Sequence, residues 1–320
     1  MNIAIVKLSA LGDIVHAMII LQFIKKAHPQ AQIDWFVEER FAPILQHNPH
    51  LRNIYAIKLK GQKIGLLSEY QKLKKIARLN RYDCVIDLQG LIKSAIVART
   101  LSKNCVGFDK NSLRESMAAW FYTTSYAIDY SENVIKRNLL LVSKALSFSM
   151  QSCDPKEPFL FSQTSSDLHP NLLIVVGSSW ESKIYPKEHF VTLINALNVP
   201  TYISWGNDKE KADAQFIEEH SHAVMLPKVS LDTLKAIIKN SALVIGADSG
   251  PTHMAWALNR PSITIFGPTP SERNTLTTHI NRTIDCHKSI DAKRLNKQDM
   301  CIKSIDPERI ILLAKELLAC

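Results

Sequence analysis

The sequence predicts an α/β protein made of two Rossmann-like domains, each with a parallel sheet. Short runs rich in β-branched residues alternate with longer amphipathic segments, which is the pattern of parallel strands joined by helical crossovers. The alternation stops in residues 151–170, where prolines and small polar residues cannot sustain a long helix, and it then resumes. The 320 residues, 46% of them hydrophobic, suffice for two cores. We therefore expect domains at 1–155 and 156–320, with a cleft between them.

The elements follow in order from these runs. In the first domain we expect strands at 3–8, 33–37, 53–57 and 84–88, and helices at 13–27, 62–80, 91–101 and 133–146. In the second we expect strands at 172–176, 201–205, 243–246 and 262–266, and helices at 187–197, 209–220, 231–240 and 252–258. Pro307 suits the first turn of a last helix, about 307–318, which is a candidate to pack back on the first domain.

Several classes of protein do not fit the sequence. It has no apolar stretch long enough to span a bilayer, and charged residues interrupt the opening run, so we expect a cytoplasmic protein. The six cysteines show neither C-x-x-C nor zinc-ligand spacing, which indicates reduced thiols, mostly buried. No D-x-D pair is present to hold a metal on a diphosphate. We therefore predict no metal and no cofactor.

The positive charge is concentrated in the first half of the chain. Residues 1–150 hold 21 Lys and Arg against 11 Asp and Glu, whereas residues 151–320 hold 18 against 19. The densest basic run contains Lys58, Lys60, Lys63, Lys72, Lys74, Lys75, Arg78 and Arg81, opposed by Glu69. This run is either a solvated helix face or a surface for phosphorylated or membrane-bound anions. It lacks a nucleic-acid-binding motif, so we expect no nucleic-acid partner.

The first candidate motif is Lys7-Leu8-Ser9-Ala10-Leu11-Gly12-Asp13-Ile14-Val15-His16, where a strand ends and a helix begins. Open α/β sheets bind ligands at such positions, and Gly12 permits close approach of a ligand to the backbone. Asp13 would lie at the helix N-terminus, whose dipole favours a carboxylate. Asp13 is therefore either a simple helix cap or a group with a chemical role. The G-x-G-x-x-G of a nicotinamide dehydrogenase is missing here.

Two loops of the second domain are suited to phosphate. Ser178, Ser179 and Lys183 follow the strand at 172–176 and offer hydroxyls and a cation to phosphate oxygens. The loop 246–253, which contains Ser249, Gly250, Thr252 and His253, follows another apolar strand and opens a helix, so its free amides form an anion site. Each loop alone could be an ordinary helix start, and His253 could be a core histidine. Together they indicate a diphosphate site.

These segments, taken with several others, resemble the heptosyltransferase I branch of the ADP-heptose:lipopolysaccharide heptosyltransferase family over nearly the whole chain. The resemblance rests on residues 6–13, Asp34-Trp35-Phe36-Val37-Glu38-Glu39, Asp87-Leu88-Gln89-Gly90-Leu91-Ile92-Lys93-Ser94, Arg114-Glu115, Trp205-Gly206, Leu226-Pro227-Lys228 and 248–253. It implies the GT-B fold, two Rossmann-like domains facing across a cleft. It also implies a metal-independent, inverting transfer of L-glycero-D-manno-heptose from ADP-heptose to the inner Kdo of Kdo2-lipid A, at the cytoplasmic face of the inner membrane.

The resemblance also assigns roles to residues of this chain. Asp13 matches the catalytic base, and Lys183 matches the lysine that stabilises charge on the leaving diphosphate. The donor-binding positions implied are Gly12, Ser178, Ser179, Lys183, Glu210, Val229, Asp248, Ser249, Gly250, Thr252 and His253. Glu210 matches a ribose-binding carboxylate and Asp248 a heptose contact, while Val229 stands where relatives often place a methionine beside adenine. Lys58, Lys93 and Arg114 match acceptor-binding positions, but the alignment of 58–63 is poor and leaves Lys60 and Lys63 open.

Three rival functions remain to be separated. The first is a transferase of the same fold with another acceptor, such as heptosyltransferase II or another ADP-sugar transferase. The second is a non-catalytic module that binds a sugar nucleotide or a lipid. The third, a nicotinamide oxidoreductase, would have to bind a dinucleotide without the glycine fingerprint.

Overall fold

The chain divides into two compact units, Met1–Phe159 and Leu160–Cys320. The computed structural model describes residues 1–58, 63–149, 156–287 and 289–319, and of residues 63–66 it describes the backbone alone. Among these residues, no helix is both long and apolar enough to cross a membrane.

The first unit is a six-stranded sheet, all of whose strand pairs are parallel, in the order β3-β2-β1-β4-β5-β6. Its strands are β1 (Asn2–Val6), β2 (Gln32–Glu38), β3 (Asn53–Ile57), β4 (Cys84–Asp87), β5 (Cys105–Phe108) and β6 (Thr124–Tyr126). Its helices are α1 (Leu11–Met18), α2 (Ile20–Ala27), α3 (Lys63–Asn80), α4 (Ile92–Leu101) and α5 (Val134–Ala145), with the short 3-10 helices η1 (Glu39–Leu45), η2 (Lys110–Ser112) and η3 (Ser116–Phe121).

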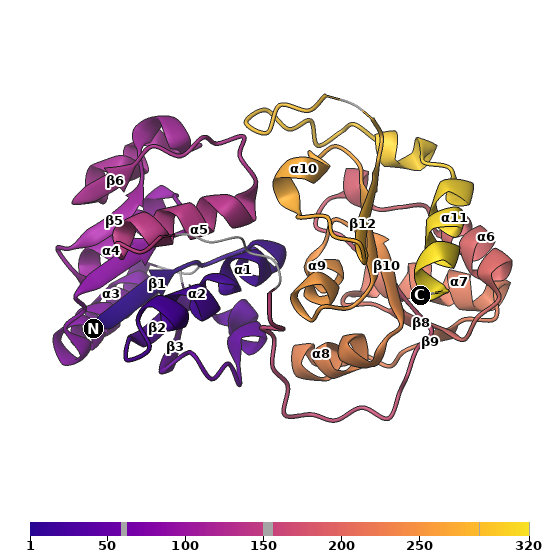
Figure 1. The fold of residues 1–320 in the computed structure, drawn as a ribbon, viewed down its shortest axis with the longest axis horizontal. Coiled ribbons are helices and arrows are strands. Elements are labelled where there is room, and N and C mark those ends of the chain that lie inside the picture. The colour runs from indigo at the N-terminus through magenta and orange to yellow at the C-terminus, as the bar shows by residue number, and fades with distance from the viewer. Residues whose placement is uncertain (59–62, 150–155, 288, 320) are drawn as a thin grey trace. The chain divides into compact units, whose positions relative to one another are not determined.

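Two sets of helices pack within this unit (Figure 1). Helices α1 and α2 both contact α5, whereas α3 packs on α4 and α4 on η3. Leu73 and Ile76 of α3 and Val97 of α4 are buried in one cluster with Val6 of β1 and Val85 of β4. Apolar side chains therefore line one side of these two helices and fasten them to the sheet, while their other side faces water.

The second unit repeats the same arrangement with strand order β12-β11-β10-β7-β8-β9, again all parallel. Its strands are β7 (Leu172–Val175), β8 (Thr201–Ser204), β9 (Val224–Met225), β10 (Leu243–Ala247), β11 (Ser262–Phe266) and β12 (Asn281–Asp285). Its helices are α6 (Lys187–Leu197), α7 (Asp208–His220), α8 (Leu231–Asn240), α9 (Gly250–Ala257), α10 (Ser271–Asn274) and α11 (Pro307–Leu318), with the 3-10 helices η4 (Glu181–Lys183) and η5 (Cys301–Ser304).

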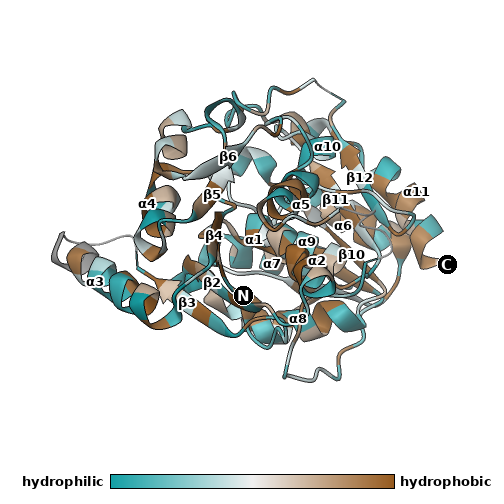
Figure 2. Cartoon of the chain, turned by 60° about the vertical axis from the view of Figure 1, so that its left-hand side comes forward, coloured by the Kyte–Doolittle hydropathy of each residue, from teal (hydrophilic) through white to brown (hydrophobic). Residues whose placement is uncertain are grey.

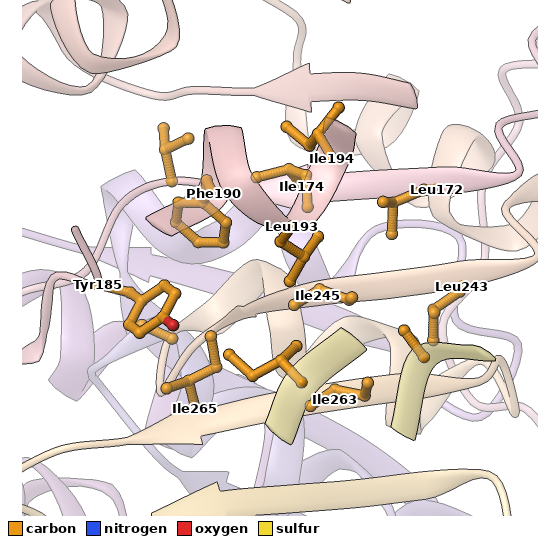
Figure 3. Packing of buried hydrophobic residues seen from close by; sticks show 14 of the residues in the cluster. Leu172, Ile174, Tyr185, Phe190, Leu193, Ile194, Leu243, Ile245, Ile263 and Ile265 are labelled. Carbon is orange, nitrogen blue, oxygen red and sulfur yellow. The ribbon is translucent and has the colours of Figure 1, made fainter. Parts of the chain in front are cut away.

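The core of the second unit lies between this sheet and helices α6 and α11 (Figure 3). Ile174, Ile245 and Ile263 come from three adjacent strands, and Phe190 and Leu193 of α6 cover them. Helix α11 packs against α6, and its Ile310 and Ile311 are buried in the same cluster. The last helix thus belongs to the second core, and its packing on the first domain stays a prediction.

The predicted fold class is confirmed: the chain is α/β, with two parallel sheets flanked by helices. The helix expected at 13–27 begins earlier, at Leu11, and is divided at Ile19, whose φ and ψ of −55° and −29° stay helical. Strands β5, β6, β9 and β12 were not predicted. They are two to five residues long. β6, β9 and β12 are edge strands and partly exposed, so they lack the continuous apolar run that marks the central strands. β5 is buried, but Gly107 interrupts its apolar run.

Candidate functional site

Each sheet has one point where the strand order reverses. In the first unit the chain moves outward from β1 to β3 and returns to place β4 beside β1. In the second unit it moves outward from β7 to β9 and returns to place β10 beside β7. Ligands of open α/β sheets bind at the carboxyl ends of the strands at such a reversal. The sequence motifs follow these four strands, so the topology brings them together in two pairs.

Asp13 is exposed in the first turn of α1, just after β1. It is the third helical residue, and its Oδ2 accepts a hydrogen bond from the backbone N of Ala10 at 3.3 Å. The simple N-cap considered from sequence is therefore wrong, because Ala10 occupies the N-cap position. The side chain folds back over the start of the helix, as the acidic residue of a capping box does. The residue is nevertheless exposed, so a group in solution can reach its carboxylate.

The turn that carries Gly12 and Asp13 is held by the loop after β4. The side-chain Oε1 of Gln89 accepts hydrogen bonds from the backbone N of Leu8 and of Ser9, each at 3.1 Å. That loop is fixed in turn by buried Asp87, which accepts bonds from Gln89 N, Gly90 N, Ser94 Oγ and Tyr122 Oη. Burial raises the pKa of Asp87 in spite of these four donors. A rigid support therefore positions the turn at the β1–β4 reversal.

Two of the predicted acceptor-binding cations are paired with the two glutamates that end β2 and begin η1. Lys93 Nζ lies 2.7 Å from Glu38 Oε1, and Lys58 Nζ lies 3.2 Å from Glu39 Oε1. Arg114 is exposed, and its neighbour Glu115 accepts a bond from Ile92 N at 2.9 Å, which places Arg114 near the start of α4. The glutamates orient the lysine side chains. Lys60 and the side chain of Lys63 lie outside the described residues.

In the second unit, Asp248 is the centre of a buried cluster at the β7–β10 reversal. Its Oδ2 lies 2.7 Å from Lys183 Nζ and accepts a bond from Thr269 Oγ1 at 2.9 Å, while its Oδ1 lies 2.8 Å from His253 Nε2. Burial alone would raise the pKa of Asp248, but the Lys183 ammonium and the His253 hydrogen bond outweigh it and hold the pKa well below its ordinary value. Both oxygens are engaged, so this geometry suits Asp248 to positioning Lys183 and His253.

Hydroxyl groups gather around the same strand ends. Ser178 Oγ donates to the backbone O of Asp248 at 2.9 Å, which ties the loop after β7 to the loop after β10. Ser249 is the N-cap residue of α9 and its Oγ lies 3.1 Å from Thr252 Oγ1. Helix α9 begins at Gly250, and the amides of a first helical turn have no acceptor within the helix. Ser179 is exposed beside this group. Together these donors suit a diphosphate.

Glu210 reaches back from α7 to the loop after β7. Its Oε2 accepts a bond from Gly206 N at 2.7 Å, and its Oε1 accepts one from Asn207 Nδ2 at 2.7 Å. A Cβ on Gly177 would stand only 2.1 Å from the Glu210 carboxyl carbon. Gly177 therefore lets this carboxylate lie directly against the loop after β7. Val229 is half-buried in the segment between β9 and α8.

If this site holds the ADP-sugar that the resemblance implies, Gly177→Ala should weaken ADP binding, because the added Cβ must displace the Glu210 carboxylate. The expected effect is an increase of about tenfold in the Kd for ADP, the equivalent of one hydrogen bond to a charged group, measured by calorimetry. Gly206→Ala is the matched control, since its Cβ would stand 3.2 Å from Glu210 Oε2 and needs a smaller adjustment. Equal affinities in Gly177→Ala and the parent chain would refute this role.

The structure joins Lys183, His253 and Ser178 to Asp248 by direct contacts. It also adds several residues that the sequence did not single out for a role. Thr269 is such a residue: it follows β11, next to β10, in a Gly-Pro-Thr loop of the kind that ends a buried strand. The sequence motifs at 34–39 and 87–94 contain three more such residues, Glu38, Glu39 and Gln89, to which the sequence assigned no role. Their function is to hold neighbouring groups, which a pattern of residue types along the chain does not reveal.

Comparison with known proteins gives a consistent result. Residues 70–303 match the model of glycosyltransferase family 9 (heptosyltransferase). The chain is 46% identical to lipopolysaccharide heptosyltransferase 1 of Campylobacter coli, over 99% of each chain. It also resembles two solved structures: E. coli heptosyltransferase WaaC with ADP-2-deoxy-2-fluoro heptose (23% identity, TM-score 0.79, 99% of each chain) and E. coli ADP-heptose lps heptosyltransferase II (20% identity, TM-score 0.77, 100% of this chain and 99% of the other). At these identities the two structures establish the fold alone.

Proposed function

The chain belongs to glycosyltransferase family 9, the heptosyltransferases, and on that premise we propose that it transfers L-glycero-D-manno-heptose from ADP-heptose to the inner Kdo of Kdo2-lipid A. Its activity is that of the first lipopolysaccharide heptosyltransferase, a step in synthesis of the inner core, because the 46% identity extends over 99% of both chains. The acceptor sugar, the inversion at the anomeric carbon and the residue roles are our proposals.

In the proposed mechanism Asp13 deprotonates the acceptor. An acceptor hydroxyl approaches the end of β1, where Asp13 Oδ atoms are exposed at the start of α1. As the hydroxyl oxygen forms a bond to the anomeric carbon of heptose, its proton passes to Asp13, and the bond from that carbon to the diphosphate oxygen breaks on the opposite face. Lys93, Lys58 and Arg114 meet the negative charges of the acceptor, and the two lysines exchange their glutamate partners for its anionic groups.

The second unit receives the departing ADP. The observation that supports this best is the Lys183–Asp248–His253 cluster at the β7–β10 reversal, beside the uncapped start of α9. Negative charge that develops on the diphosphate meets the Lys183 ammonium, the hydroxyls of Ser178, Ser179, Ser249 and Thr252, and the helix dipole. Glu210 accepts a hydrogen bond from the ribose, and Val229 packs on the adenine. The transfer we propose needs no metal, because the sequence has no D-x-D pair and supplies these donors instead.

The direct test is mass spectrometry of the product formed from ADP-heptose and Kdo2-lipid A, with an already heptosylated lipid A as the second acceptor. We expect one heptose to be added to Kdo2-lipid A and little to the heptosylated acceptor. Turnover of the heptosylated acceptor alone would instead identify a second-step transferase, the main alternative within this fold. Activity that persists in EDTA would support the metal-independent mechanism.

We propose that the enzyme works at the cytoplasmic face of the inner membrane and that α3 contributes an electrostatic contact. Lys74, Lys75 and Arg78 are exposed on this helix. Lys72 is also exposed, but it is partly engaged, since its Nζ donates to Ala56 O at 2.9 Å and lies 3.7 Å from Glu69. Lys74 Nζ lies 4.6 Å from the centre of the Tyr70 ring, a contact that leaves its positive charge uncompensated. The charges of Lys74, Lys75 and Arg78 therefore suit anionic headgroups better than that of Lys72.

Charge reversal of Lys74 and Lys75 should therefore weaken binding to phosphatidylglycerol vesicles by more than tenfold at low salt, since each basic residue near such a surface contributes about 1 kcal/mol and reversal adds repulsion. The measurement is vesicle co-sedimentation over a series of salt concentrations. The control is charge reversal of Lys239, which is exposed on α8 of the second unit. Unchanged binding and an unchanged salt dependence in the α3 variant would contradict the contact.

A further inference from the structure

Three large apolar side chains are exposed on α4 and η3 of the first unit. Trp120 is 78% exposed, Met117 49% and Ile96 44%. Val97 and Ala98, which neighbour Ile96 in sequence, are buried in the core, so the exposed side chains lie on the side of these elements that faces away from the sheet. A single exposed apolar residue is ordinary on a protein surface, but a group of three that includes a tryptophan indicates an interaction site.

These side chains lie on one continuous surface. Helix α4 packs directly on η3. Near one end, Ile92 N donates to Glu115 Oε2 at 2.9 Å, and near the other, Arg99 Nη1 donates to Thr123 Oγ1 at 3.2 Å. The two segments therefore run side by side in the same direction. Ile96 lies between Ile92 and Arg99 on α4. Met117 and Trp120 lie between Glu115 and Thr123 on the neighbouring segment.

Basic residues outnumber acidic ones in this part of the chain. From residue 93 to residue 123 the chain carries Lys93, Arg99, Lys103, Lys110 and Arg114 against Asp109 and Glu115. Glu115 accepts the bond from Ile92 N, and Lys93 is paired with Glu38. Asp109 is occupied locally, because its Oδ1 accepts bonds from Ser112 N at 2.9 Å and Ser112 Oγ at 2.5 Å. Helix α3 packs on α4 and carries further exposed cations and exposed apolar residues. In Figure 2, hydrophobic (brown) and hydrophilic (teal) residues alternate along this helix.

We propose that this surface, formed by Ile96, Met117 and Trp120 with the basic residues from 93 to 114, docks onto an anionic lipid bilayer, with Trp120 in the headgroup region. An aromatic ring with a polar edge suits the bilayer interface, and long basic side chains around it reach the headgroup phosphates. A second copy of the chain fits less well, because it would bring two positive surfaces together. The inference rests on the proposed function and deepens it: Arg114, three residues before Met117, meets the acceptor where that acceptor leaves the bilayer.

The first test compares substituted full-length chains in flotation with phosphatidylglycerol–phosphatidylethanolamine vesicles. We expect Trp120→Ala to weaken partitioning about tenfold, the order expected when one large apolar side chain no longer leaves water. Trp120→Phe should keep most of the binding. Leu312→Ala is the control, because Leu312 is 63% exposed on α11 of the second unit. Equal losses in Trp120→Ala and Leu312→Ala, or no loss in either, would overturn the proposal.

The second test locates the side chain directly. Tryptophan emission of the parent chain should shift to shorter wavelength on vesicle addition and be quenched by brominated lipids, and Trp120→Phe should abolish both effects. Trp120→Ala should turn over a soluble, deacylated acceptor as fast as the parent chain does, so a failure of the docking surface is distinguishable from a failure of the transferase function. If light scattering without lipid shows a dimer that Trp120→Ala dissociates, the surface binds a second copy and the lipid proposal is wrong.

Discussion

Replacing Asp13 by asparagine is expected to lower kcat for heptose transfer by about 100- to 10,000-fold, the range in which a positioned general base contributes. The Kd for ADP-heptose should remain within about twofold, since Asp13 belongs to the first unit and the groups that suit the diphosphate belong to the second. Asparagine is nearly the same size as aspartate but cannot take up a proton at neutral pH. The measurements are steady-state turnover with Kdo2-lipid A and calorimetric titration with ADP-heptose.

Comparison with Asp13→Ala separates catalysis from helix capping. Asparagine can still accept the hydrogen bond from Ala10 N, whereas alanine loses it and with it about 1 kcal/mol or less of helix stability. A purely structural Asp13 would leave Asp13→Asn active and Asp13→Ala impaired and less stable. The base that we propose requires both variants to be inactive, with a lower Tm in Asp13→Ala alone.

Lys183→Met should reduce both stability and turnover. The substitution removes the ammonium that lies 2.7 Å from Asp248 Oδ2 and leaves that carboxylate buried with His253 and Thr269 as its partners. Breaking one side of a buried ion pair costs about 3–5 kcal/mol, and the two remaining donors favour the lower end of that range. Separately from this loss of stability, the missing positive charge at the leaving diphosphate should reduce kcat by about 100- to 1,000-fold. That is roughly the effect of removing one preorganised donor.

The double variant Lys183→Met/Asp248→Asn distinguishes the two effects. A neutral amide in place of the carboxylate no longer requires a cation, so urea unfolding should show most of the lost stability restored. Turnover should stay low, because the amide supplies no charge to ADP. Recovery of activity along with stability would show that Lys183 acts only through folding, and the proposed role at the diphosphate would then be abandoned.

The central strands and the motifs at their ends could be predicted from sequence because one physical pattern marks both. A strand covered on two faces is a run of apolar residues, as in 172–176 and 243–246. The candidate site residues directly follow the end of such a run. Three of the four edge strands carry no such mark: β6 and β12 are short and partly exposed, and β9 spans two residues. Their existence is decided by the pairing partner beside them, which lies elsewhere in the chain.

The candidate site was predictable as a set of residues and less so as a set of contacts. The positions of Asp13, Lys183 and Asp248 after strand ends follow from the sequence. The occupation of both Asp248 oxygens does not, because Thr269 and Lys183 meet that carboxylate from loops 21 and 65 residues away in the chain. Contacts of this kind depend on strand order, which local patterns leave open.

The division of the chain at Phe159 has a consequence for how such enzymes diversify. Strands β1–β6 all precede Phe159 and strands β7–β12 all follow it. Neither sheet therefore contains a strand from the other half of the chain. A genetic crossover at this division would keep all strand pairs of both sheets intact. Under the proposed division of roles, such a crossover would change the acceptor preference through the first half and leave the donor site of the second half unchanged.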